Sequence, residues 1–241
     1  MDLGMQAQAM GYDRASTMFS PEGHLLQVEY AAKTVKLGAA SIGISCSDGV
    51  LIVADKRIKD ELMLPSSAAK IYEIDSHIGA TAAGILSDAR VLIDRAQLHA
   101  QQHKVTYDSI IDTESIVKEM ANSQQMFTAY GGARPLGINV LVIGVDNDDS
   151  PHLFVTDVMG NYFGYRATSI GENDEKIKDM LRKEYKDSLT IDQGIALSLK
   201  IFSRILGKNF DIMRFEAAVI RKKEKKFKRI VGGELQKYIK L

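Results

Sequence analysis

The chain of 241 residues lacks several features that mark special classes of protein. It has a single cysteine, Cys46, so no intramolecular disulfide can form, and a reducing compartment is favoured. No run of about 18 apolar residues occurs, which argues against a membrane-spanning helix. Its 31 Lys and Arg balance 31 Asp and Glu, so the whole chain has no field to attract nucleic acid or acidic lipid. We therefore expect a cytoplasmic protein that binds neither nucleic acid nor membrane.

The chain also lacks a linker rich in Pro, Gly or Ser. We therefore expect one domain over residues 12–241. Residues 1–11 show no hydrophobic period, and we expect them to be mobile until something holds them. They include the acidic Asp2 and no basic or apolar run, so they do not have the pattern of a signal peptide.

The rest of the chain switches between strand and helix periods. Ser20, Pro21 and Glu22 have the order of an N-cap, a first-turn proline and a first-turn acid, so we predict a helix that begins there and ends at Gly38. Further helices are predicted over 86–103, 112–130, 173–185 and 191–206. Strands are predicted over 42–46, 50–53, 70–74, 78–82, 138–145, 153–156, 215–220 and 227–230.

These predicted elements favour an α+β fold. The strands come as hairpins with short turns and the helices come in pairs, which differs from the strict βαβα order of a parallel sheet. We predict a four-layer α-β-β-α sandwich, in which two antiparallel sheets carry a helix pair on each outer face. Cys46 follows the inward alternation of its strand and is predicted to be a small core residue.

Two short patterns could carry chemistry, and for both we favour a structural role. Ser67 and Lys70 fit the S-x-x-K pattern of serine acyl-transferases, but the chain has no Lys-Thr-Gly, and Lys70 begins a predicted strand rather than a helix. His99 and His103 have the i, i+4 spacing of a metal pair but lack a glutamate base and a third ligand nearby. We predict neither a metal nor a cofactor.

Residues 221–229 form a strongly basic run around Phe227. Read alone, the run suggests nucleic-acid binding. Apolar strand residues precede and follow it, so we favour a solvated turn of a hairpin. A basic rim that faces an acidic partner stays open as an alternative.

A much longer motif occupies residues 12–31, YDRASTMFSPEGHLLQVEYA. It resembles the N-terminal signature of α-type subunits of the 20S proteasome core particle, of the archaeal kind. The resemblance extends along essentially the whole chain. It includes Asp55-Lys56-Arg57, Lys70-Ile71, Gly84, Asp88-Ala89-Arg90 and residues 131–137. The family fold is the four-layer sandwich of N-terminal-nucleophile hydrolases, so the resemblance and the hydrophobic periods predict the same architecture.

The same fold also serves β-type subunits, which are threonine peptidases. Their chemistry needs a Thr, Ser or Cys freed at a chain terminus after a Gly, with a carboxylate and a lysine nearby. The resemblance matches Asp55 and Lys70 to these two helpers, but Ala39 follows Gly38 at the position of the nucleophile. Because Ala39 offers no nucleophile, we predict a non-catalytic subunit of a threonine-type endopeptidase complex. A β-type threonine peptidase is the alternative.

The resemblance implies a gate at the N-terminus. Tyr12, Asp13, Pro21 and Tyr30 match the family's gate cluster, in which phenols and a carboxylate form hydrogen bonds across neighbouring subunits and the proline fixes a reverse turn. Residues 1–11 would then be the gate segment. Taken singly, each of these residues could belong to a local turn or helix cap, and for a lone tyrosine we would favour that local role.

The resemblance also implies a docking pocket. Lys70, Gly38 and Leu25 match the pocket between adjacent α subunits that receives the C-terminal carboxylate of an activator ATPase. Without the resemblance, Lys70 would be read as a solvated lysine at the end of a strand. The implied partners are other α subunits in a ring of seven, β subunits, and the C-terminal tails of activator ATPases. Which activator docks, and whether the ring is homomeric, stays open.

Overall fold

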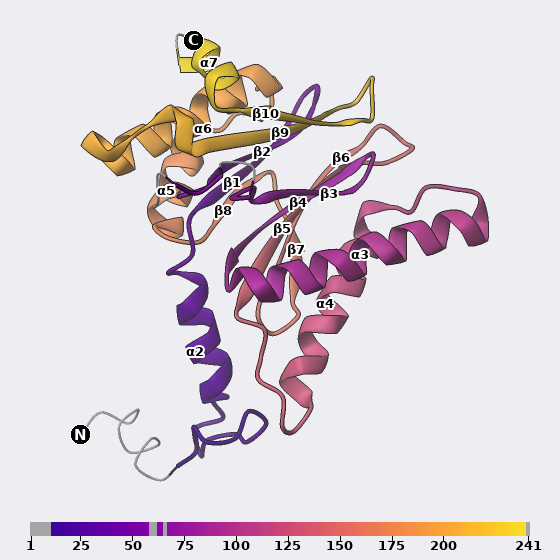
Figure 1. The fold of residues 1–241 in the computed structure, drawn as a ribbon, viewed down its shortest axis with the longest axis vertical. Helices are drawn as coiled ribbons and strands as arrows, with labels where there is room; N and C mark the ends of the chain where they lie inside the picture. Colours follow the sequence, from indigo (N-terminus) through magenta and orange to yellow (C-terminus); the bar gives the residue numbers. More distant parts are fainter. Residues whose placement is uncertain (1–10, 58–61, 65–66, 240–241) are drawn as a thin grey trace.

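The structure, a computed structural model, describes residues 11–57, 62–64 and 67–239. Two five-stranded antiparallel sheets lie face to face in it (Figure 1). The first sheet has the order β10 (Phe227–Val231), β9 (Phe215–Arg221), β2 (Gly49–Asp55), β1 (Ser41–Cys46) and β8 (Ala167–Ile170). The second has the order β3 (Ile71–Asp75), β4 (Ile78–Gly84), β5 (Ile138–Val145), β6 (Pro151–Thr156) and β7 (Tyr162–Gly164).

Helix pairs cover both outer faces of this sandwich (Figure 1). The helices α3 (Leu86–Tyr107) and α4 (Thr113–Ala129) pack on the second sheet, and α5 (Asp174–Glu184) and α6 (Ile191–Leu206) pack on the first. Shorter helical segments are α7 (Gln236–Ile239) and the 3₁₀ turns η1 (Gly207–Asn209), η2 (Ile212–Arg214) and η3 (Gly232–Leu235). The chain therefore has the four-layer α-β-β-α sandwich that its hydrophobic pattern predicted.

The alternation of side chains along the central strands produces three core layers. In β2, Val50 and Ile52 pack between the two sheets, whereas Leu51 and Val53 pack under α5 and α6. Successive side chains of a strand point to opposite faces, so a central strand covered on both faces is apolar throughout. All seven residues of β2 are accordingly buried. Cys46 is 4% exposed in the layer under α6, which confirms its predicted core role.

The helix α2 (Leu26–Val35) lies at one end of the sandwich (Figure 1). Val28 and Val35 on one of its faces join the core between the sheets. The predicted start of this helix at Ser20 is wrong, because a turn occupies residues 20–23. The Gly23 N–H donates to the Ser20 carbonyl at 2.9 Å, and Gly23 has a φ of 82° that an α-helix cannot accept.

This turn nevertheless gives Pro21 the role of fixing a reverse turn. Pro21 stands at the second position of the turn, where its restricted φ is favourable, and Gly23 closes it. The Ser20 hydroxyl accepts the His24 N–H at 3.2 Å, so it caps the turn instead of a helix. The sequence Ser-Pro-Glu-Gly fits both a helix N-terminus and a reverse turn. The positive φ of Gly23 shows that the chain forms the turn.

Most other elements agree with their predicted bounds to within a few residues, and the exceptions are short. Residues 162–164 and 167–170 form β7 and β8, which lie in different sheets, so the chain crosses between the sheets at this point. Strands of three and four residues are too brief to show an alternating pattern. Within the part of the chain that the structure describes, we find no helix with the length and hydrophobicity needed to cross a membrane.

Candidate functional site

A cavity of about 770 Å³ lies where the end of α2, the end of β2, the start of β3 and the start of α3 meet. We call it the Lys70 cavity. Its lining residues are Leu37, Ala39, Lys56, Arg57, Met63, Ser67, Ala68, Ala69, Lys70, Tyr72, Gly84, Leu86, Ser87 and Arg90.

The lining of the Lys70 cavity is unbalanced in charge. Lys56, Arg57, Lys70 and Arg90 contribute four basic side chains, and no Asp or Glu is among the described residues that line it. Neither Lys56 nor Arg90 forms an ion pair with any residue of the described ranges. A concave site lined by one sign of charge concentrates ligands of the opposite sign. The cavity is therefore suited to an anion.

Lys70 lies at the floor of this cavity and is only 4% exposed. Its Nζ donates to the carbonyl of Ala39, to the Ser41 hydroxyl at 3.1 Å and to the Ala40 carbonyl at 3.4 Å. The alternative of a solvated lysine at the end of a strand is therefore wrong. The backbone of residues 39–41 holds the ammonium in place.

The burial of Lys70 changes its acidity. Burial lowers the pKa of the Lys70 amine from 10.5 to about 7, because the charged form loses its hydration. The Asp55 carboxylate opposes this shift, and the positive charge of Arg57 adds to it. The charge at the floor of the cavity is consequently sensitive to pH in the neutral range.

Two buried carboxylates stand behind Lys70. Asp55, 3% exposed, accepts hydrogen bonds from Arg214 at 2.8 and 2.6 Å and from the Arg57 N–H at 2.9 Å. Glu216, 1% exposed, accepts the backbone N–H groups of Lys70 at 2.5 Å and Ile71 at 2.9 Å. Sequence reasoning missed Glu216, although an acidic residue within the otherwise apolar strand 215–220 was a visible signal.

The structure brings Ala39, Asp55 and Lys70 together as the resemblance implied. The side chain at the position of the nucleophile is a methyl group. Ala39 also lies within the chain between Gly38 and Ala40, so its nitrogen is part of a peptide bond, and the Asp55 N–H holds the next residue by donating to the Ala40 carbonyl at 3.0 Å. A buried lysine and a carboxylate thus lie beside a residue 39 that has no nucleophilic side chain. The Ser41 hydroxyl, which contacts Lys70, is fully buried within β1.

The three residues matched to the docking pocket are only partly gathered in one chain. Gly38 precedes Ala39, whose carbonyl Lys70 contacts, and a Cβ at Gly38 would meet the Gly84 nitrogen at 2.3 Å. Only glycine fits at this close approach. Leu25 stands at the other end of α2, about 15 Å away along the ten-residue helix, and does not line the cavity.

The residues matched to the gate lie beside α2. The Gln27 amide donates to the Asp13 carbonyl at 2.5 Å, which joins the turn at residues 11–14 to the helix. Tyr30 follows Gln27 by three residues and so lies on the same helical face. Pro21 is in the turn that leads into α2, and Tyr12 is half-buried beside Asp13. Residues 1–10 of the expected gate segment lie outside the described residues.

Comparisons with known proteins agree with this geometry. The family profile described as "Proteasome subunit" matches residues 35–220, and a second profile, for the N-terminal signature of the proteasome's A-type subunits, matches residues 12–33. The chain belongs to the proteasome subunit family. The N-terminal signature places it among the α-type subunits.

Curated relatives cover nearly the whole chain. The proteasome alpha subunit of Methanosarcina barkeri is 41% identical over 233 residues, which cover 97% of this chain and 93% of that protein. The proteasome alpha subunit of Archaeoglobus fulgidus is 40% identical over 240 residues, covering 98% and 95% of the two chains. The one from Pyrococcus abyssi is 42% identical over 229 residues, covering 95% and 87%.

The other candidate motifs of this α-type subunit have local partners. The Ser67 hydroxyl donates to the Leu64 carbonyl at 2.7 Å, and the His103 ring contacts the Ser109 carbonyl at 3.2 Å. No group of three metal-ligating side chains occurs among the described residues. In the basic run, Arg221 pairs with two aspartates at 2.9 Å each and Lys225 pairs with Asp149 at 2.7 Å. The run forms the end of the β9–β10 hairpin, as predicted.

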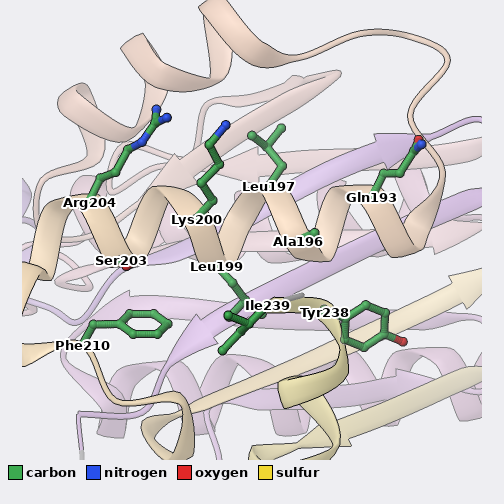
Figure 2. Close-up of a pocket in the computed structure, with 10 residues that line it drawn as sticks. All are labelled: Gln193, Ala196, Leu197, Leu199, Lys200, Ser203, Arg204, Phe210, Tyr238 and Ile239. Atoms are coloured by element: carbon green, nitrogen blue, oxygen red, sulfur yellow. The ribbon is translucent and has the colours of Figure 1, made fainter. Parts of the chain in front are cut away.

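A second hollow, of about 540 Å³, lies between α6 and α7 (Figure 2). We call it the α6–α7 groove. Its lining residues are Gln193, Ala196, Leu197, Leu199, Lys200, Ser203, Arg204, Phe210, Tyr238 and Ile239. Figure 2 shows Lys200 and Arg204 extending from α6 to the side away from Phe210 and Tyr238. Both basic side chains bind the Glu184 carboxylate, at 2.7 and 2.5 Å, so the groove has little free charge for a ligand.

Proposed function

We propose that this α-type subunit is a non-catalytic, ring-forming component of a proteasome core particle that admits substrate and docks activators. The observation that carries the proposal is the Lys70 cavity, in which a buried lysine and a nearby carboxylate stand beside Ala39 instead of a nucleophile. The names of the relatives support the assignment to the core particle. The single free Cys46 suits the reducing cytoplasm.

The chemistry of residue 39 supports the proposal that the chain has no peptidase activity of its own. A threonine peptidase of this fold attacks with a terminal side chain and uses its own α-amine as the base. Ala39 supplies no attacking oxygen or sulfur, and its nitrogen is part of a peptide bond that leads back through Gly38 to α2. Lys70 and Asp55 therefore have no nucleophile to activate at residue 39, and Ser41 lies inside strand β1, where it is not a chain terminus. A β-type threonine peptidase is disfavoured for the same reason.

The charge of the cavity supports docking of a carboxylate. Four basic side chains line it, and Lys70 supplies positive charge where little water reaches. A tail carboxylate that enters such a partly desolvated site gains more than it would at an exposed surface. We propose that the ligand is the C-terminal tail of an activator ATPase. Because Leu25 is remote from the cavity of its own chain, we propose that a neighbouring subunit of a seven-membered ring contributes it.

The position of α2 supports the proposal of a gate. Residues 12, 13, 21 and 30 lie on or beside this helix, so their phenol and carboxyl groups can meet those of an adjacent copy in the ring. We propose that residues 1–11 form the segment that these contacts hold across the pore. The β subunits would lie below the α ring and carry out hydrolysis.

Native mass spectrometry with a peptidase assay tests the proposal. The full chain should form rings alone or with a β-type subunit from its own source, and it should cleave fluorogenic peptides only in the mixed particle. Removal of residues 1–11 should raise hydrolysis by that particle in the absence of an activator. A chain that stays monomeric with every β subunit would refute the assignment. Unchanged hydrolysis by well-formed truncated particles would refute the gate.

A further inference from the structure

An ion pair stands at the mouth of the Lys70 cavity. Arg57, which follows β2, donates through Nη1 to the Leu37 carbonyl at 3.4 Å and through Nη2 to the Glu172 carboxylate. The Arg57 side chain is 30% exposed and that of Glu172 is 49% exposed. Leu37 and Arg57 line the cavity, whereas Glu172 does not. A ligand inside the cavity can therefore contact the Arg57 guanidinium. Glu172 contacts the same guanidinium but is not part of the cavity lining.

The backbone fixes both partners of this pair. Arg57 has a φ of 45°, a left-handed conformation that is unfavourable for a residue with a side chain, and the Asp55 carboxylate stabilises it by accepting its N–H at 2.9 Å. Glu172 N–H donates to the Gly38 carbonyl at 2.8 Å. Both side chains thus start from constrained positions next to the backbone of Gly38 and Ala39.

Arg57 has more unused hydrogen-bond donors than Lys70. A guanidinium carries five N–H groups, and contacts with Leu37 and Glu172 engage only part of them. An ammonium carries three, and the structure supplies three acceptors for Lys70, the oxygens of residues 39, 40 and 41. A carboxylate that approaches Lys70 feels its charge, but more of the free donors belong to Arg57.

We propose that Arg57 donates hydrogen bonds to the carboxylate of the docked tail alongside the charge of Lys70, and that Glu172 occupies Arg57 while the cavity is empty. The inference rests on the proposed docking function and adds a regulatory contact to it. Docking exchanges one arginine–carboxylate pair for another, because the fork of a guanidinium binds a carboxylate of either origin. Glu172 is thus an internal competitor that lowers the affinity for a free C-terminus.

Fluorescence anisotropy with a labelled peptide tests the exchange. The probe is the peptide Gly-Ser-Gly-Ser-Leu-Tyr-Leu with a free carboxylate, compared with the same peptide as its C-terminal amide, on the full chain in its assembled state. Glu172→Gln should tighten binding of the carboxylate peptide about threefold to tenfold and leave the amide unchanged, since it removes only the competing charge. Arg57→Gln should weaken the carboxylate peptide about tenfold or more and reduce the preference for carboxylate over amide.

Glu184→Gln is the matched control. It releases Lys200 and Arg204 in the α6–α7 groove by the same chemical change and should not alter binding of either peptide. A thermal melt of each variant checks that the fold is intact, and a gain of affinity in Glu172→Gln cannot come from misfolding.

The outcomes separate this inference from the docking proposal. Binding that is lost in Lys70→Ala but unchanged in Arg57→Gln and Glu172→Gln would overturn the exchange and leave docking in place. Weaker or unchanged binding in Glu172→Gln would by itself overturn the competitor role. No binding of the carboxylate peptide to the assembled wild-type chain would overturn both.

Discussion

The Lys70 cavity and the α6–α7 groove both place basic side chains beside apolar ones, yet they use the charges in opposite ways. In the groove, Lys200 and Arg204 are about half exposed and share the Glu184 carboxylate. In the cavity, Lys70 is buried and its ammonium contacts only uncharged oxygens, while the nearest carboxylates are engaged by arginines and backbone N–H groups. The positive charge is neutralised at the first site and available at the second.

This difference shows that the number of basic residues does not mark an anion site. Exposed ion pairs contribute little, because water screens both partners. A buried ammonium with carbonyl partners keeps its charge directed at whatever enters the cavity. Of these two hollows, the Lys70 cavity is therefore suited to recognition, whereas the charges of the α6–α7 groove are already matched. Substitutions at each site test this difference.

The largest effect is expected from Lys70→Ala in the assembled particle. Removing the buried cation from each pocket should cost docking roughly 2–5 kcal/mol per site. Because an activator with several tails binds by avidity, the loss compounds across the ring, and stimulation of peptide hydrolysis should disappear. Basal hydrolysis and ring assembly should stay normal. Lys200→Ala in the groove is the matched control and should leave stimulation intact. If an activator stimulates the Lys70→Ala particle normally, the Lys70 cavity is no more important for docking than the α6–α7 groove.

Asp55→Asn should destabilise the fold by about 3 kcal/mol, measured by denaturant unfolding of the full chain. The variant leaves Arg214 and the neighbouring Lys70 without their buried anion. Glu184→Gln removes a partly exposed anion from two cations that are about half exposed, and should cost less than about 1 kcal/mol. Equal losses for the two variants would show that the charges of the cavity are screened as effectively as those of the groove.

Docking should weaken as the pH rises through neutrality. Since burial lowers the pKa of Lys70 to about 7, the cavity loses this charge above that pH. Affinity for the carboxylate peptide should fall about fivefold between roughly pH 6.5 and 8. Lys70→Arg keeps its charge at every pH of this range, so its weaker binding should be independent of pH. If the affinity of the wild-type chain changes with pH as little as that of Lys70→Arg, the lowered pKa of Lys70 is contradicted.

The same shift predicts an opposite trend for stability. The unfolded Lys70 holds its proton up to about 10.5, whereas the folded one releases it near 7. The unfolded state therefore binds more protons between these values, and the contribution of Lys70 to the free energy of unfolding rises with pH across this window. This contribution should be absent in Lys70→Ala. Denaturant unfolding of both chains at pH 7 and pH 9 measures it: the free energy of unfolding should rise more between the two pH values in the wild-type chain than in the variant.

A small loss of stability is expected at the start of α3, where Arg134 binds the Asp88 carboxylate at 2.6 and 2.7 Å. Burial acts to raise the pKa of Asp88, but the hydrogen bonds from Arg134 and Gly137 outweigh it and lower the pKa below its usual value. The stability from this pair is present at neutral pH and is lost as the pH falls through the lowered pKa. Asp88→Asn should cost about 1 kcal/mol, since Arg134 is mostly exposed. A larger loss of stability, measured by thermal melting, would show that the Asp88–Arg134 pair is as poorly screened as the buried charges beside the Lys70 cavity.

Sequence reasoning succeeded where a pattern is local. The continuous apolar runs at residues 50–53 and 138–145 mark strands buried on both faces, and the period of 3.6 in residues 191–206 marks a helix buried on one face, so these elements agree with their predicted bounds to within a few residues. It failed at residues 20–23, where the same four residues fit a cap and a turn. It also missed β7 and β8, which pairing with neighbouring strands stabilises more than their own composition does.

Residue types and their spacing were enough to predict the layered architecture, the membership of the family through residues 12–31, and the lack of a nucleophile at Ala39. Three features could be seen only in the folded chain: Lys70 is buried, Glu216 accepts the backbone N–H groups of residues 70 and 71, and Arg57 contacts Glu172, which is 115 residues away along the chain. Hydration and ion pairing depend on which atoms surround a charged group, and packing between distant segments sets those surroundings.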